Sequence, residues 1–172
     1  LGFRRQPSAR EAQHVIEHAI DSGVNFLDCA NNYSVTATRK SEEVLGQVLQ
    51  TKRDDVVITS KVNTPTGQGP NDRGTSRYHI MREIDRSLSR LETDHLDVYI
   101  LHGWDESTPL EETMRALDDL VTAGKTRYVG VSNFQAWQVM KALWTQDQLT
   151  VDPLICIQNP YNLLNRALEQ EM

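Results

Sequence analysis

The fold is decided by the stretch Leu96-Asp97-Val98-Tyr99-Ile100-Leu101-His102. Before the histidine its residues are mostly β-branched, aromatic or aliphatic, and polar and apolar side chains do not alternate. That pattern is typical of a parallel strand buried on both faces. Similar short apolar runs occur on either side of it, at 24–27, 56–59, 128–131 and 154–157.

Amphipathic helices are predicted before and between these runs. Ser8, Ser41 and Ser76 each precede a segment with apolar residues at helical spacing, Thr108 and Glu111 predict a capping box, and a fifth helix is expected over about 135–144. Strand and helix alternate with a period of about 30 residues, the size of a β-α-β unit. The alternation predicts a parallel sheet with right-handed crossovers, and both a doubly wound sheet and a (β/α) barrel satisfy it.

Composition limits the classes of function. The 172 residues are 38% hydrophobic and 24% charged, which is ordinary for a globular domain. The net charge of −6 argues against general binding to nucleic acid or anionic membranes, and no apolar run approaches the roughly 18 residues of a membrane span. Cys29 and Cys156 lie in apolar segments, which indicates reduced thiols in the cytoplasm.

We treat 1–172 as one domain. Because it begins at Leu1 and ends in a helix-like segment, we expect it to be part of a longer protein.

Every predicted strand ends in polar or ionisable residues. Each of these residues taken singly is more often a helix cap or a solvated loop residue. In parallel α/β folds, however, the carboxyl ends of the strands meet at one rim, where function is found. The residues that we expect to share this rim are Asp28, Lys61, His102, Ser132, Asn133 and Gln158.

Tyr33 lies five residues after Asp28 and is either a packing residue of the rim or a source of a phenol for the same site. A free phenol has a pKa of about 10 and is a weak acid at neutral pH. A nearby ammonium group from Lys61 strengthens such an acid, and Asp28 would hold that ammonium in place. His102 would position a carbonyl group. This set supports proton donation to a carbonyl oxygen.

A reduction also needs a hydride, which none of these side chains supplies, so a nicotinamide cofactor is required. The hydroxyl and amide groups of Ser132, Asn133 and Gln158 suit the carboxamide of that cofactor. The pattern His14-x-x-Glu17-His18 resembles a zinc-peptidase motif. Its histidines lie opposite the apolar face of the helix, so we predict a solvated surface and no metal.

Five segments resemble signatures of the aldo-keto reductase family, in the style of its bacterial and channel-β-subunit branches. In chain order they are GVNFLDCANNY (23–33), VVITSK (56–61), LDVYILHGWD (96–105), GKTRYVGVSNF (124–134) and ICIQNPYNLLNR (155–166). The resemblance covers nearly the whole chain.

The resemblance implies a parallel (β/α)8 TIM barrel that binds NADPH without a Rossmann domain. It implies that Tyr33 is the general acid, that Lys61 and Asp28 tune it, and that His102 orients the substrate. Trp104 would line the substrate pocket, while Ser132, Asn133 and Gln158 would bind the nicotinamide amide.

A barrel of this kind needs roughly 250 residues. The strands present match the second to the sixth, so we expect an incomplete barrel that lacks the last strands. NADPH rather than NADH is a family expectation alone.

Four functions remain open. The leading one is an NADPH-dependent oxidoreductase that reduces a small aldehyde or ketone. A lysine-based aldolase would use Lys61 to form a Schiff base, although the Asp28–Tyr33 pair argues against it. A regulatory subunit would keep the fold and act by protein contact, and a truncated fragment would be inactive. Neither the natural substrate nor the oligomeric state follows from the sequence.

Overall fold

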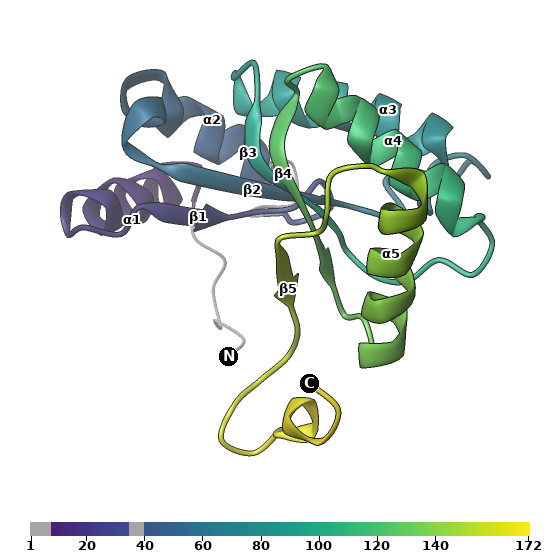
Figure 1. The fold of residues 1–172 in the computed structure, drawn as a ribbon. Helices are drawn as coiled ribbons and strands as arrows, with labels where there is room; N and C mark the ends of the chain where they lie inside the picture. Colours follow the sequence, from purple (N-terminus) through teal and green to yellow (C-terminus); the bar gives the residue numbers. More distant parts are fainter. Residues whose placement is uncertain (1–7, 35–39) are drawn as a thin grey trace.

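A curled, half-barrel sheet forms the centre of the protein (Figure 1). We describe it from a computed structural model, in which residues 8–34 and 40–172 are described. The five strands are all parallel and lie in the order of the chain. They are β1 (Phe26–Asp28), β2 (Val57–Val62), β3 (Leu96–Leu101), β4 (Thr126–Ser132) and β5 (Cys156–Gln158).

Helices precede the sheet and connect its successive strands. They are α1 (Ala9–Asp21), α2 (Ser41–Lys52), α3 (Arg77–Leu91), α4 (Leu110–Thr122) and α5 (Ala136–Leu149), with short 3₁₀ turns η1 (Arg53–Asp55) and η2 (Ala167–Gln170). Consecutive helices pack on one another along the outer side of the sheet. This is the α/β architecture of an incomplete (β/α)8 barrel, as the sequence predicts. None of the described helices has the length and apolar character needed to cross a membrane.

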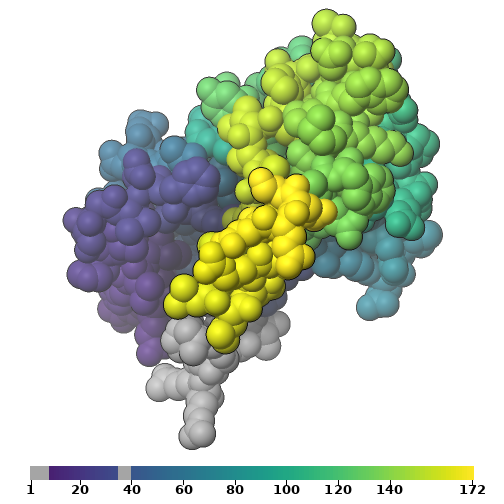
Figure 2. Space-filling model, turned by 60° about the horizontal axis from the view of Figure 1, so that its bottom comes forward, coloured from purple at the N-terminus to yellow at the C-terminus, as the bar shows by residue number. Residues whose placement is uncertain are grey.

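The hydrophobic core lies between the outer helices and the central strands β2, β3 and β4. Ile58 of β2, Ile80 of α3 and Leu117 of α4 have no exposed surface. The edge strands are less covered, and Phe26 of β1 is 55% exposed while Ile157 of β5 is 44% exposed. Figure 2 shows the segment after β5, in yellow, between the purple N-terminal part and the green part that contains α5.

The strand register brings the polar strand ends to one level. Asp28 is paired with Thr59, Lys61 with Ile100, and Ser132 with Gln158. Asp28, Ser132 and Gln158 are the last residues of their strands, whereas Lys61 lies within β2. The predicted runs at 24–27, 56–59 and 154–157 thus mark strands that continue into the polar residues after them.

The predicted ends of the helices are confirmed in part. Ser8 and Ser76 cap α1 and α3, as predicted, and Ser8 forms a capping box with Glu11. The capping box of Thr108 and Glu111 is wrong, because the Thr108 hydroxyl donates to Asp105 and the cap of α4 is Pro109. Helix α5 continues to Leu149, beyond the predicted end near 144.

Candidate active site

A buried lysine paired with a carboxylate lies at the centre of the rim. Lys61 has no exposed surface, and its Nζ donates to Asp28 Oδ1 at 2.6 Å and to the carbonyl oxygen of Cys29 at 2.9 Å. Thr59 Oγ1 donates to the same Oδ1 at 2.5 Å, and Gln158 Nε2 donates to Oδ2 at 3.2 Å. Burial raises the pKa of Asp28, but hydrogen bonds from Lys61, Thr59 and Gln158 outweigh it and hold that pKa below its ordinary value of 3.8. The carboxylate is therefore ionised at neutral pH.

Tyr33 extends toward this pair from the loop after β1. Its hydroxyl oxygen lies 3.3 Å from His102 Nε2, and the two rings meet edge to face with centroids 5.6 Å apart. Lys61 Nζ lies 5.0 Å from the centroid of the tyrosine ring. Tyr33 is 40% exposed, so part of its side chain faces solvent while its hydroxyl contacts His102. Four side chains from three strand ends and one loop therefore converge.

His102 follows β3 directly and is held from two sides. Its Nδ1 lies 3.2 Å from Thr64 Oγ1, opposite the contact with Tyr33. Burial and then the charge of Lys61 lower the pKa of His102 from its ordinary 6.5, while Asp28 acts weakly in the opposite direction. The imidazole is therefore neutral near pH 7 and acts through hydrogen bonds rather than as a cation.

Hydrogen bonds join the same cluster to Ser132, Asn133 and Gln158. Ser132 Oγ donates to the Gln158 carbonyl at 2.7 Å, and Asn133 Nδ2 donates to the His102 carbonyl at 2.9 Å. Asn133 has a φ of 58°, a left-handed conformation that asparagine tolerates better than most residues. These contacts connect the end of β4 with those of β3 and β5, and the hydrogen bond from Gln158 to Asp28 connects β5 with β1.

A cleft opens beside His102 and Trp104. Its volume is about 630 Å³, and its walls come from the loops after β2 and β3. Trp104 packs edge to face against Phe134 and Trp137, with centroids 5.3 and 5.5 Å away. Trp104, which is predicted to line a substrate pocket, therefore lines a cleft that adjoins His102, the contact partner of Tyr33.

The two loops that form the cleft are held together by Asp105. Its carboxylate accepts hydrogen bonds from the Thr75 backbone at 2.8 Å and from the Ser107 backbone at 2.9 Å. Burial raises the pKa of Asp105, but the donors around it outweigh burial and lower that pKa to about 2. The loop after β2 is therefore attached to the loop that carries Trp104.

Sequence reasoning missed two residues of the cluster, Thr59 and Thr64. Thr59 is two residues before Lys61 on the same strand, so alternation along β2 places both side chains on one face. That spacing was a usable signal. Thr64 lies in a loop, and no local pattern predicts its contact with His102. Among residues 8–34 and 40–172, no group of three or more His, Cys, Asp or Glu residues is arranged to hold a metal ion.

The sequence profile of the Aldo/keto reductase family matches residues 2–172. The chain belongs to this family. The family expected from the five motif segments is thereby confirmed, and the half-barrel is the part of the family's fold that these residues form.

Curated members of the family are similar over nearly all of this chain. It is 38% identical over 167 residues to a probable voltage-gated potassium channel subunit beta of Arabidopsis thaliana, covering 95% of this chain and 50% of the relative. It is 34% identical over 180 residues to the uncharacterized oxidoreductase YrpG of Bacillus subtilis, covering 100% and 55%. It is 33% identical over 168 residues to the L-glyceraldehyde 3-phosphate reductase of Escherichia coli, covering 95% and 48%. The chain thus spans about half the length of these relatives.

Proposed function

We propose that the complete protein reduces the carbonyl group of a small aldehyde or ketone to an alcohol, with NADPH as the hydride donor. The observation that carries the proposal is the contact set of Tyr33, Lys61, Asp28 and His102 at one rim. Membership of a family with members named as reductases and oxidoreductases supports it. The free thiols of Cys29 and Cys156 support a reducing compartment such as the cytoplasm.

Each of the four residues has a distinct role in this reaction. The Tyr33 hydroxyl gives its proton to the carbonyl oxygen as the carbonyl carbon is reduced. Lys61, held by Asp28, stabilises the phenolate left behind, because its ammonium lies 5.0 Å from the ring centroid. His102 stays neutral and orients the carbonyl oxygen by a hydrogen bond.

The residues present fit a nicotinamide. Ser132, Asn133 and Gln158 gather one hydroxyl and two carboxamide groups beside His102 and Asp28. These groups donate and accept hydrogen bonds, as an amide ligand requires. When bound, the nicotinamide supplies the hydride. The choice of NADPH over NADH rests on the resemblance to the family.

A Schiff-base role for Lys61 is less well supported. Its Nζ is buried, forms an ion pair with Asp28 and donates to the Cys29 carbonyl. A lysine nucleophile needs a free lone pair and access to the substrate carbon, whereas this Nζ is enclosed and already engaged by two acceptors. Borohydride trapping with a carbonyl substrate would detect such an adduct, and we expect none.

A regulatory role is the second candidate. A relative that is 38% identical over 167 residues is named as a probable potassium channel β subunit. Such a protein could keep the site and act by protein contact. Steady-state assays of the complete protein with NADPH and 4-nitrobenzaldehyde separate the two functions. The proposal predicts NADPH consumption and alcohol formation, whereas NADPH binding without turnover of this or other generic aldehydes would favour the regulatory role.

A further inference from the structure

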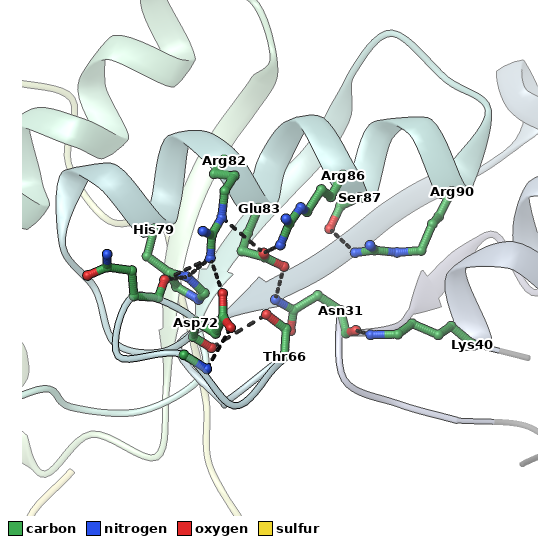
Figure 3. A network of polar contacts seen from close by, with 12 residues as sticks. Asn31, Lys40, Thr66, Asp72, His79, Arg82, Glu83, Arg86, Ser87 and Arg90 are labelled. Atoms are coloured by element: carbon green, nitrogen blue, oxygen red, sulfur yellow. Dashed lines mark hydrogen bonds and ion pairs between the residues drawn. The ribbon is translucent and has the colours of Figure 1, made fainter. Parts of the chain in front are cut away.

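A buried carboxylate on α3 lies at the centre of a polar network behind the rim (Figure 3). Glu83 has no exposed surface. Its Oε1 accepts from Arg86 Nη1 at 2.8 Å and lies 3.9 Å from Arg82 Nε, and its Oε2 accepts from Asn31 Nδ2 at 3.1 Å. A buried charge is tolerated only when its partners satisfy it, so these contacts fix the position of the carboxylate.

Asn31 connects that carboxylate to the loop of Tyr33. It is fully buried, lies two residues before Tyr33, and its backbone N–H donates to the Lys61 carbonyl at 3.4 Å. Its own carbonyl accepts from Lys40 Nζ at 2.6 Å. The Tyr33 N–H in turn donates to the Ala30 carbonyl at 3.2 Å. Asn31 therefore joins the turn that carries the phenol to the strand that carries the ammonium.

The same network reaches the wall of the cleft. Arg82 Nη2 donates to Asp72 Oδ1 and to the Asn71 carbonyl, both at 2.7 Å. Asp72 Oδ2 accepts from the Gly69 backbone N–H at 2.9 Å. Asn71 lines the cleft beside His102. One cluster on α3 thus holds both the turn after β1 and the loop after β2.

We infer that Glu83 is a positioning residue, which acts through Asn31 to keep the Tyr33 hydroxyl against His102. Its effect on turnover rests on the proposed reductase function, whereas its effect on the turn does not. Among the residues that the structure describes, Glu83 has no hydrogen bond or ion pair with Tyr33 or His102, and its partners are Asn31, Arg82 and Arg86. Its influence therefore passes through the amide of Asn31, and removing that amide should abolish the influence.

The test compares four forms of the complete protein with wild type: Glu83→Gln, Asn31→Ala, the double variant and Asp97→Asn. Asp97 is the matched control, because its carboxylate also pairs with an arginine, at 3.0 Å from Arg53, but lies near the opposite end of β3. Amide hydrogen exchange of residues 29–33 reports the order of the turn without reference to activity. Reduction of 4-nitrobenzaldehyde reports kcat and KM.

Glu83→Gln leaves one acceptor oxygen for two donors, Arg86 Nη1 and Asn31 Nδ2, and Asn31→Ala removes the Asn31 donor. We therefore expect each variant to speed exchange in 29–33 by about tenfold, the effect of losing a hydrogen bond at a buried polar group. We expect kcat to fall by a similar factor with little change in KM. The double variant should resemble the single variants, because both remove one connection. Asp97→Asn should lower the melting temperature and leave 29–33 and kcat as in wild type.

The inference would be overturned if Glu83→Gln left the exchange rate of residues 29–33 unchanged, or if Asp97→Asn raised that rate as much. It would also be overturned if the effects of the two single variants added up in the double variant. Faster exchange with unchanged kcat in an active enzyme would overturn it as well. If exchange rises as expected but the wild type reduces no carbonyl substrate, the anchoring of the turn by Glu83 is upheld and the proposed reductase function fails.

Discussion

Lys61 has no exposed surface and lies between Asp28 and Tyr33. Its sequence context, a lysine ending an apolar run, predicts a position at the rim. The context does not predict that three further donors and acceptors fix the Lys61–Asp28 pair, because those partners come from the residue after β1, from β2 and from β5. Position at the rim follows from chain order, and contact follows from the register of strands far apart in sequence.

Lys61→Met tests the role of the ammonium. In the complete protein we expect kcat to fall by about 10²-fold or more, because the phenolate loses its adjacent cation and the acid is weakened. We also expect the pH–rate profile to move toward higher pH. A profile in the same position as that of wild type would contradict the assigned role of Lys61.

The buried His79 and the partly buried His102 predict how the stability of the fold depends on pH. The pKa of His102 is lowered by burial and then by Lys61, and that of His79 is lowered mainly by burial. A depressed histidine pKa stabilises the fold above the unfolded value of about 6.5, and this stability is lost as the pH falls through the folded pKa. The melting temperature should therefore decrease as the pH falls below about 6.5. His102→Gln should make that decrease shallower, and an equally steep decrease in this variant would contradict the prediction.

At the scale of elements, the sequence predicts all five strands and five helices, because their apolar spacing is regular. It misses features that depend on neighbouring elements. Glu42 lies in the first turn of α2, where its position within the helix indicates only a favourable interaction with the helix dipole. In the structure it is buried, and its carboxylate accepts from Ser60 Oγ at 2.5 Å and Arg90 Nε at 2.6 Å. The partner strand and helix decide that role, so no pattern within α2 predicts it.

Gly46 tests how closely α2 approaches α3. A Cβ at this position would lie 2.5 Å from the Arg90 carbonyl oxygen and 2.9 Å from the Leu91 carbonyl carbon. Helix propensity alone predicts that Gly46→Ala stabilises the protein by about 0.5–1 kcal/mol. We expect the opposite, a loss of about 1–3 kcal/mol in the free energy of unfolding, because the backbone of α3 cannot yield. Urea denaturation decides, with the exposed neighbour Gln47→Ala as control, and a stabilised Gly46→Ala would contradict the close approach.

At the scale of the whole molecule, the half-barrel has apolar side chains on its edge strands. Phe26 is 55% exposed and Ile157 is 44% exposed, on β1 and β5 respectively. Unpaired strand edges and exposed apolar surface favour association. We expect the 172-residue chain, produced by itself, to bind the dye ANS strongly, and Phe26→Ser to weaken that signal. Negligible dye binding by the unaltered chain would contradict this expectation.

The central claim is that Tyr33 gives the proton to the carbonyl oxygen. It is tested most directly by single-turnover reduction of 4-nitrobenzaldehyde in the complete protein loaded with NADPH, comparing wild type with Tyr33→Phe. We predict that the variant binds NADPH with unchanged affinity and reduces the aldehyde about 10²–10⁴-fold more slowly. A single-turnover rate equal to that of the wild type would remove Tyr33 from the role of the acid.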